Sequence, residues 1–333
     1  VYPGYLAVTV AVGLEIGTRL LFPEVADSDR LMEGAYRRVL NSYVHAASAQ
    51  SADFGFQLRP NTQRELRRGQ LRYTVITNSA GFRGREPAPR EPGEYRILLL
   101  GDSMVFGDGL QEDETIAVQL ERAGADLERP VTVFNGALSG MNTVQELLVI
   151  RHLAPVVQPD HVVLGYFVSN DPLPNTISHV DGDGRFSLDE GAAQRLRTRL
   201  RQSLAPMLTS HALRTVLLPF FVPRLRSTWS ASPAVIARSC ALIGEVAAAS
   251  RAADAVFSTV ILYGREGTAG GPSDWWSGSR AVGLRLGRCL SERGIEVLDA
   301  TAFMDGRADR NECYFPRDGH LNPSGARRVA EAI

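Results

Sequence analysis

Residues that could carry nucleophilic chemistry follow the predicted strands of this chain, at the points where those strands end. The triplet Gly-Asp-Ser at 101–103 comes directly after the aliphatic run 97–100, and Asp318 and His320 precede the last predicted helix. A serine hydroxyl is a poor nucleophile until a base accepts its proton, and histidine does so near neutral pH. A carboxylate beside the other ring nitrogen holds the imidazole in one tautomer. These residue types predict a nucleophilic serine with a histidine base.

Two further strand ends offer hydrogen-bond donors for a developing oxyanion. The second strand is followed by Asn135, Gly136 and Gly140, and the third by Asn170 and Asp171. Preorganised N–H donors aimed at such an oxygen contribute about 3 kcal/mol each. A glycine lets the backbone approach closely, and an asparagine amide donates without competing for the proton. Gly136 and Gly140 are equally good turn glycines by sequence.

Short apolar runs alternate with helical patterns from residue 95 onward. This alternation predicts a parallel sheet covered by helices on both faces, a three-layer α/β/α sandwich. Ligands bind such a sheet beyond the carboxyl ends of its strands, so the four polar clusters should meet at one rim. The expected strands are 96–100, 131–135, 161–167, 255–263 and 295–300, and the expected helices are 113–127, 143–157, 233–252, 279–293 and 322–333.

The order of these blocks resembles the SGNH (GDSL) hydrolase family, whose four invariant residues are Ser, Gly, Asn and His. The resemblance implies that Ser103 is the nucleophile and His320 the base, oriented by Asp318. It implies an oxyanion hole formed by the N–H groups of Ser103 and Gly140 and by the side chain of Asn170. It also implies a flavodoxin-like sheet and a reaction without a metal or an organic cofactor.

The chain departs from the family pattern at three places. Met104 replaces the leucine of the family name, and Val168 stands where a glycine is usual. Arg317 occupies the position three before the histidine that commonly holds the acid, so Asp318, two before it, takes that role. Asp299, in the last predicted strand, is the alternative acid.

The chain divides into three parts. Residues 1–23 form either the remnant of a membrane anchor or an amphipathic helix, on which Glu15 and Arg19 could pair. Residues 24–93 are an N-terminal extension and a linker, and 94–333 are the hydrolase domain with an insertion at about 172–230. The stretch TNSAGFRG in the extension is associated with bacterial, often anchored or exported family members. We therefore expect a location outside the cytoplasm or in the cell envelope.

Composition excludes several classes of function. A net charge of −1 gives no reason to expect nucleic acid as a partner, and all 36 basic residues are arginine, which excludes a lysine Schiff base. Cys240, Cys289 and Cys313 show no zinc-ligand spacing. The sequence is compatible with one disulfide among these three cysteines or with none, and it does not define the oligomeric state.

Several neighbours of the predicted site have two interpretations. Asp102 is expected to hold the turn before the nucleophile, whereas Asn135 and Asn142 could line the site or serve the fold. The pair Trp275–Trp276 could grip an acyl chain or sugar, or pack on the core. The arginine-rich stretch 195–204 resembles a solvated helix face.

These observations predict a serine esterase that hydrolyses carboxylic esters, in particular O-acyl or O-acetyl groups, through an acyl-serine intermediate. The substrate would be a small-molecule, glycan or lipid ester, and the N-terminus could associate with a membrane. Two alternatives stay open. One is an O-acyltransferase on cell-envelope glycans that uses the same three residues, and the other is a non-catalytic glycan-binding protein.

Overall fold

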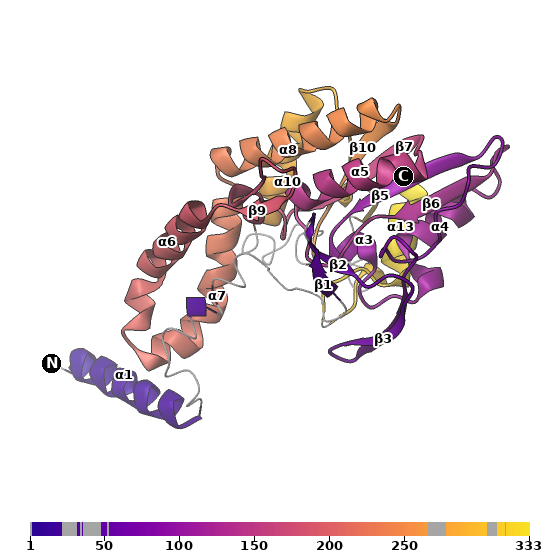
Figure 1. Cartoon of the computed structure of the whole chain (residues 1–333). Coiled ribbons are helices and arrows are strands. Elements are labelled where there is room, and N and C mark those ends of the chain that lie inside the picture. Colours follow the sequence, from indigo (N-terminus) through magenta and orange to yellow (C-terminus); the bar gives the residue numbers. More distant parts are fainter. Residues whose placement is uncertain are drawn as a thin grey trace.

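A parallel five-stranded sheet forms the centre of the molecule (Figure 1). The computed structural model describes residues 2–21, 32–33, 35, 48–51, 53–265, 278–304, 312–316 and 318–333. The strands lie in the order β11-β10-β7-β5-β6, and every neighbouring pair is parallel. Their bounds are β5 (Tyr95–Gly101), β6 (Val131–Asn135), β7 (His161–Phe167), β10 (Val256–Leu262) and β11 (Glu296–Asp299).

Helices cover both faces of this sheet, which confirms the predicted three-layer sandwich (Figure 1). On one face lie α5 (Thr143–Val157), α8 (Pro233–Ala252) and α10 (Ser279–Ser291), and on the other α4 (Ile116–Ala123) and α13 (Pro323–Ala332). The bounds of α5 and α8 are those that the sequence predicts. The short elements are α3 (Ser103–Phe106), η2 (Glu112–Glu114), η3 (Pro174–Thr176) and α11 (Thr301–Met304).

Polar caps explain where the helices begin. The Asn142 side chain accepts a hydrogen bond from the Val144 N–H at 3.0 Å and so starts α5. Asn322 accepts from the Gly325 N–H at 3.0 Å, and Pro323 occupies the first turn of α13. These caps satisfy N–H groups that have no partner within the helix.

The N-terminal extension packs against the core of the sandwich. Its described residues form two antiparallel hairpins, β1 (Ser48–Ser51) with β2 (Gly55–Leu58) and β3 (Gln63–Arg68) with β4 (Leu71–Ile76), followed by a turn at 78–81. Residues of the extension that belong to the main hydrophobic cluster are Phe54, Leu58, Tyr73, Val75 and Phe82.

Arg83 fixes the loop that follows the serine of the 101–103 triplet. Its buried guanidinium donates to the carbonyls of Gly107 and Leu110 at 2.8 and 2.7 Å, and it pairs with Glu112 at 3.0 Å. Buried backbone carbonyls need such partners. The extension therefore stabilises backbone close to the predicted nucleophile.

The insertion at 172–230 contains a hairpin and two long helices. The hairpin is β8 (Ser178–Val180) with β9 (Phe186–Leu188), and the helices α6 (Glu190–Leu208) and α7 (His211–Ser230) pack together as an arm that extends from the sandwich (Figure 1). The arginines of 195–204 lie on the exposed surface of α6, as predicted. A second hydrophobic cluster supports this arm and includes Leu173, Ile177, Ala193, Leu200, Leu204, Val222 and Trp229.

Helix α1 (Tyr2–Leu21) lies against α7 at the far end of the arm. Glu15 and Arg19 form the predicted pair at 2.7 Å. Glu15 also accepts from the N–H groups of Ala212 and His211, both at 3.0 Å, and these donors lower the pKa of its carboxyl. Glu15 therefore joins α1 to the start of α7. Large apolar side chains of α1 that stay exposed are Val10, Val12, Leu14, Ile16, Leu20 and Leu21.

By length and composition, the helix that could cross a membrane among the described residues is α8. Half of it is buried against its neighbours, as in a core helix of a soluble protein. Its Cys240 forms a disulfide with Cys289 of α10, with their Cα atoms 6.3 Å apart. Cys313 is buried and outside this disulfide.

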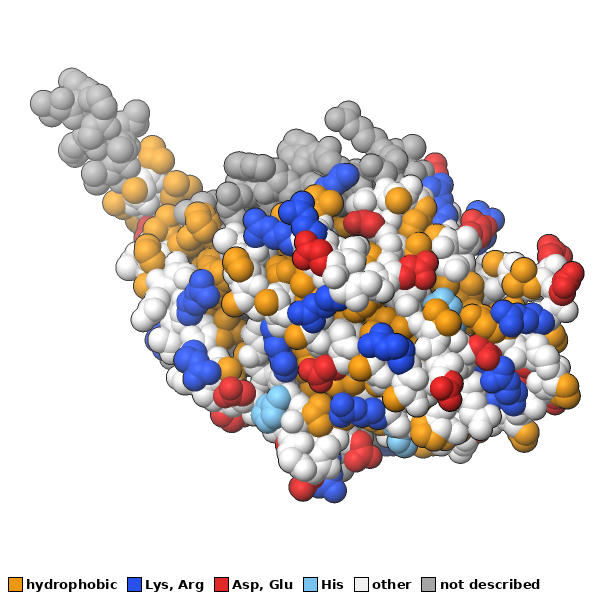
Figure 2. All heavy atoms as spheres, turned by 90° about the horizontal axis from the view of Figure 1, so that it is seen from above, with side chains coloured by type: hydrophobic (Ala, Val, Ile, Leu, Met, Phe, Trp, Pro, Cys, Tyr) orange, Lys and Arg blue, Asp and Glu red, His pale blue; other side chains and the backbone are white. Residues whose placement is uncertain are grey.

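Charges on the side of the molecule that carries α5 and α8 are mixed. Figure 2 looks down on that side and shows basic and acidic side chains interspersed, with apolar side chains gathered on the arm. Among the side chains coloured there, no broad field of one sign faces the solvent. This agrees with the net charge of −1.

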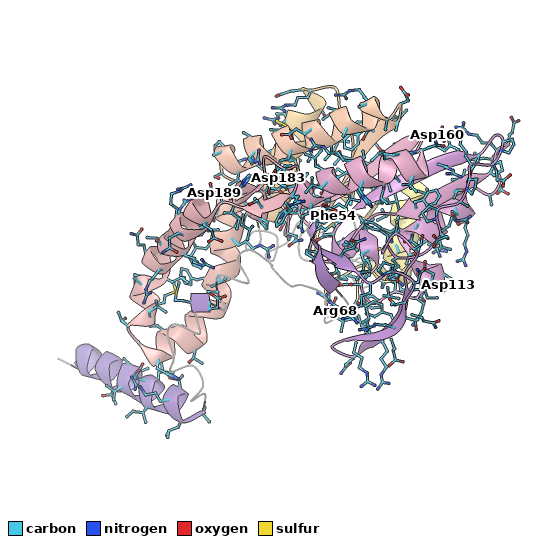
Figure 3. All side chains as sticks on the ribbon, viewed as in Figure 1. Phe54, Arg68, Asp113, Asp160, Asp183 and Asp189 are labelled. Atoms are coloured by element: carbon cyan, nitrogen blue, oxygen red, sulfur yellow. A yellow bond between two sulfur atoms is a disulfide. The ribbon has the colours of Figure 1, made fainter. Side chains whose placement is uncertain are left out.

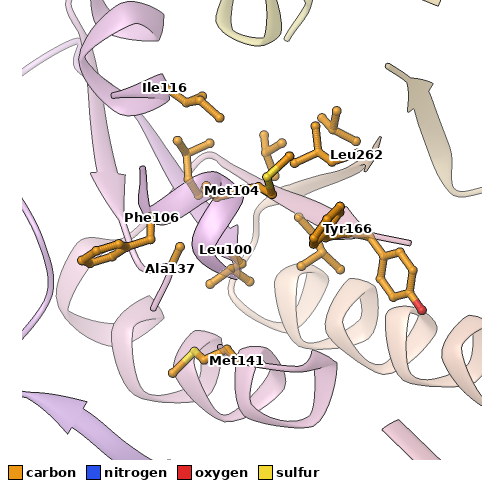
Figure 4. Close-up of a cluster of buried hydrophobic side chains, with 14 of the residues drawn as sticks. Leu100, Met104, Phe106, Ile116, Ala137, Met141, Tyr166 and Leu262 are labelled. Carbon is orange, nitrogen blue, oxygen red and sulfur yellow. The ribbon is translucent and has the colours of Figure 1, made fainter. Parts of the chain in front are cut away.

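Apolar side chains of α3 pack beneath the predicted nucleophile. Met104, Val105 and Phe106 are at most 3% exposed (Figure 4). Gly165 on β7 lies opposite Gly101 on β5, and this pair leaves room for Val105. A Cβ at Gly165 would stand 2.3 Å from Val105 Cγ2. The glycine pair thus lets α3 sit directly on the sheet.

Gly165→Ala is expected to destabilise the protein by about 1–3 kcal/mol, because overpacking would push Val105 and α3 away from the sheet. Urea unfolding measures this. The matched control is Gly287→Ala in α10, where the nearest atom would be 3.4 Å from the new Cβ, so stability should stay equal or rise. Equal stability of wild type and Gly165→Ala would show that Val105 does not need this space.

Candidate active site

Ser103, His320 and Asp318 lie in one hydrogen-bonded row. His320 Nε2 is 2.8 Å from Ser103 Oγ, and His320 Nδ1 is hydrogen-bonded to Asp318 Oδ1. Ser103 and His320 are 6% and 8% exposed, so little water competes for these bonds. The sheet therefore brings together the three side chains that the sequence analysis selected from opposite ends of the domain.

Local turns set the orientation of each member of this row. Ser103 is the first residue of α3, and one residue, Asp102, separates it from the end of β5. Asp102 Oδ1 accepts from the Met104 N–H at 2.9 Å and so starts this helix. His320 lies in a tight loop in which the Phe315 N–H donates to its carbonyl at 2.9 Å. Gly319, with φ of 84°, turns this loop where a larger residue would be strained.

Asn170 lies beside the row and is oriented by Asp102. Its Nδ2 donates to Asp102 Oδ2 at 2.8 Å, and it is 3.4 Å from the Met141 carbonyl. Asp102 holds the turn, as expected, but its second oxygen has a role that the sequence did not indicate. The amide nitrogen carries two hydrogens, so the short bond to Asp102 directs the other hydrogen toward the Met141 carbonyl, to which it makes a longer bond.

The structure distinguishes the two glycines that the sequence left equal. The Gly136 N–H donates to the Leu99 carbonyl at 2.8 Å, so it cannot serve an oxyanion. Gly140 adopts φ of 89°, which requires a glycine. Within the described residues, no carbonyl accepts from the N–H of Gly140 or of Ser103. Both N–H groups are thus available to a ligand.

The remaining candidates serve the fold. Asn135 Oδ1 accepts from the Ala137 N–H at 3.1 Å, and Asn142 starts α5. Asp299, the alternative acid, accepts from the Tyr263 hydroxyl at 2.9 Å and from Thr301 Oγ1 at 2.7 Å. It is not joined to His320. Trp275 and Trp276 lie outside the described residues.

Arg68 is the second feature that the sequence analysis missed. Its Nε donates to Asp318 Oδ2 at 2.8 Å. Partial burial disfavours the charged form of Asp318, but His320 and Arg68 outweigh this effect and lower the pKa of the carboxyl to about 2. Asp318 is therefore ionised at neutral pH, as an acid that orients a histidine must be.

Three buried carboxyl groups, those of Asp102, Glu146 and Asp171, lie behind the row. Burial raises the pKa of Asp102 to about 6, against the opposing effects of the Met104 N–H, His320 and Asn170. Burial also raises the pKa of Glu146 and Asp171 well above the usual range, and the neighbouring carboxyls add to this. No donor among the described residues lies within hydrogen-bond distance of either oxygen of Glu146, and the nearby Thr143 hydroxyl lowers the pKa without reversing its rise. A neutral Glu146 fits these surroundings.

Glu146→Gln is expected to raise the free energy of unfolding by about 1 kcal/mol at pH 8 and to change little at pH 4. The folded state keeps the proton of Glu146, whereas the unfolded chain loses it above its ordinary pKa, so wild-type stability falls as the pH rises. Urea unfolding from pH 4 to 8 measures the slope. The control is Glu245→Gln, at an exposed site on α8, which should keep the wild-type slope of the free energy of unfolding against pH. The same wild-type slope in Glu146→Gln would show that Glu146 is ionised in the folded protein.

The described residues contain no cluster of three or more His, Cys, Asp or Glu side chains placed to hold a metal ion. The row and its surroundings offer three kinds of contact. These are a hydroxyl against an imidazole, an imidazole against a carboxylate, and two backbone N–H groups with one amide nearby. Such a set performs acyl transfer on known folds.

Comparisons with known proteins find a likeness among solved structures alone. No protein-family model and no curated protein matches the chain. The psychrotrophic esterase EstA from Pseudoalteromonas sp. is 15% identical, with 71% of this chain and 92% of that one covered and a TM-score of 0.40. A lipase/acylhydrolase from Enterococcus faecalis is 14% identical, with 72% and 93% covered and a TM-score of 0.41. A member of the lipolytic protein G-D-S-L family from Veillonella parvula is 15% identical, with 71% and 94% covered and a TM-score of 0.39.

Proposed function

We propose that this chain is a serine esterase of the SGNH type. The observation that carries the proposal is the row in which His320 Nε2 meets Ser103 Oγ at 2.8 Å while Nδ1 meets Asp318. The row stands at the carboxyl end of β5, where a parallel sheet binds its ligands.

The reaction follows from these positions. Ser103 Oγ attacks the ester carbonyl carbon while its proton passes to His320 Nε2. Negative charge develops on the carbonyl oxygen, where the N–H groups of Ser103 and Gly140 stabilise it, together with the Asn170 amide hydrogen that would exchange its long bond to the Met141 carbonyl for the oxyanion. The first tetrahedral intermediate then collapses: the bond between the carbonyl carbon and the alcohol oxygen breaks, and His320 gives its proton to that oxygen. An acyl-serine and an alcohol result.

The second half repeats the first with water in place of the alcohol. His320 takes a proton from the water, whose oxygen attacks the acyl carbon of the acyl-serine. Collapse of the second tetrahedral intermediate releases the carboxylic acid and returns the proton to Ser103. Throughout, the ionised Asp318 stabilises the imidazolium form of His320.

A location outside the cytoplasm is part of the proposal. The Cys240–Cys289 disulfide supports it, since disulfides persist in oxidising compartments. The exposed apolar side chains of α1 support contact with a membrane. The substrate class that fits is an O-acyl or O-acetyl ester of the cell envelope.

Hydrolysis of p-nitrophenyl esters from acetate to decanoate tests this function. We expect saturable hydrolysis that is fastest with short acyl chains. Product analysis with and without a glycan acceptor separates hydrolysis from transfer. If the acylated acceptor forms in place of the free acid, the protein is an O-acyltransferase and not an esterase. A wild-type protein inert on every ester, and unchanged by a glycan acceptor, would refute acyl transfer in favour of glycan binding.

A further inference from the structure

Arg68 reaches the predicted site from the N-terminal extension. It is the last residue of β3, at the tip of the β3–β4 hairpin, where Figure 3 labels it. Its Nε donates to Asp318 Oδ2 at 2.8 Å and its Nη1 to Asp108 Oδ2 at 2.6 Å. One guanidinium thus joins a hairpin, the loop after α3 and the loop before α13.

The bond to Asp318 fixes the carboxylate that orients His320. One oxygen, Oδ1, bonds His320 Nδ1, and the other, Oδ2, bonds Arg68. A carboxylate held at both oxygens cannot rotate about its terminal bond without losing a charge-assisted hydrogen bond. The imidazole therefore receives a fixed acceptor.

The bond to Asp108 reaches the other side of the site. Asp108 is 1% exposed and also accepts from Tyr73 Oη at 3.1 Å and from Ser139 Oγ at 2.8 Å. Ser139 directly precedes Gly140, whose N–H is a proposed oxyanion donor. Arg68 therefore links the acid of the row to the loop that carries this donor.

Charge and shape favour arginine at this position. The site is partly buried, which disfavours a cation, but the two carboxylates outweigh burial and raise the pKa of Arg68. The planar fork of a guanidinium can bond two carboxylates in fixed directions, which a lysine ammonium does not do. Without this cation, the buried Asp108 would lose its ion pair at 2.6 Å.

We propose that Arg68 is a positioning residue for ester hydrolysis, which acts through Asp318 on His320 and through Asp108 and Ser139 on the loop of Gly140. This inference rests on the proposed function. It makes the β3–β4 hairpin a part of the active centre, although the hairpin precedes the nucleophile in the chain.

Kinetics of Arg68→Gln with p-nitrophenyl acetate test the proposal. We expect kcat to fall about 10- to 100-fold with KM unchanged, since hydrogen bonds to a charged group are lost and no substrate contact is removed. Arg68→Lys keeps the positive charge but not the planar fork of the guanidinium, so its kcat should lie between those of the wild type and Arg68→Gln. The control is Arg67→Gln, the exposed neighbour on the same strand, which should keep the wild-type kcat.

A double-mutant cycle separates positioning from a merely structural role. If Arg68 acts in part through Asp318, Arg68→Gln should lower kcat by a smaller factor in an Asp318→Asn background than in the wild type, because only the route through Asp108 is left. Additive losses, or a wild-type kcat in Arg68→Gln, would overturn the proposal. A urea midpoint within the range of Arg67→Gln would show that the variant is folded.

A spectroscopic measurement decides the same point without a substrate. The low-field proton signal of His320 Nδ1–H should shift or broaden in Arg68→Gln and stay unchanged in Arg67→Gln. An unchanged signal in Arg68→Gln would overturn the inference even if the esterase is confirmed. If the wild type is inert on esters but its His320 signal still shifts on the change Arg68→Gln, the proposed function alone would be refuted.

Discussion

Replacing Ser103 with alanine is expected to lower kcat for p-nitrophenyl acetate on the order of a million-fold, to the rate of the uncatalysed reaction plus what the oxyanion donors supply. The variant loses the one oxygen that His320 Nε2 contacts at 2.8 Å, while the small cavity left at a hydroxyl should not unfold the protein. Initial rates at saturating ester measure this effect.

Two controls accompany Ser103→Ala. Ser203→Ala, at an exposed serine on α6, should keep the wild-type rate. The double variant Ser103→Ala/His320→Ala should be no slower than either single variant, because residues that act as a unit are not additive. Substantial activity left in Ser103→Ala would assign the nucleophile to another residue.

Asp318→Asn is the second large effect, and we expect kcat to fall about ten-thousand-fold. The amide can present N–H to His320 Nδ1, which would favour the wrong tautomer and leave Nε2 unable to accept the Ser103 proton. Ester hydrolysis at pH 8 measures kcat, and Asp299→Asn serves as the matched control because Asp299 bonds Tyr263 and Thr301 instead.

The same substitution should change stability in acid. The pKa of Asp318 is lowered from 3.8 to about 2 in the folded state, so its contribution to the free energy of unfolding is present above pH 4. That contribution disappears as the pH falls from about 4 to about 2. Asp318→Asn should lose this part of the acid dependence. An unaltered acid transition, or full activity at pH 8, would show that Asp318 is not held as described.

The sequence predicted the sheet well because each strand is a short apolar run that alternates with a helical pattern, although α4 (Ile116–Ala123) is shorter than the predicted helix 113–127. The bounds of β7, α5 and α8 agree with the predicted ones to the residue, since each has a clear apolar pattern and a cap or turn at its start. The serine, histidine and acid could be selected for the same reason: each follows a strand or precedes a helix that the pattern already placed.

The insertion at 172–230 could not be assigned from sequence. Helix α6 carries Pro206 within its last turns and exposes its arginines, so its apolar stripe is narrow. Its few buried residues, such as Leu200 and Leu204, pack on α7 and the arm rather than on the sheet. A short apolar stripe of this kind resembles an irregular polar segment until its partner helix is known.

Long-range contacts explain what was missed at the site. Arg68 and Asp318 are 250 residues apart, and nothing in the local pattern of β3 distinguishes Arg68 from Arg67 beside it. The second role of Asp102 depends on Asn170, 68 residues later. The disulfide joins cysteines 49 residues apart without any motif. Only the packing of the whole domain brings these pairs together.

Labelling with a fluorophosphonate tests the central claim most directly, because the reagent bonds to an activated serine without needing the natural ester. We expect one adduct per chain, mapped by mass spectrometry to the peptide that contains Ser103, and its loss in both Ser103→Ala and His320→Ala. An unlabelled wild type, or an adduct that persists in His320→Ala at the wild-type rate, would contradict a serine nucleophile activated by His320.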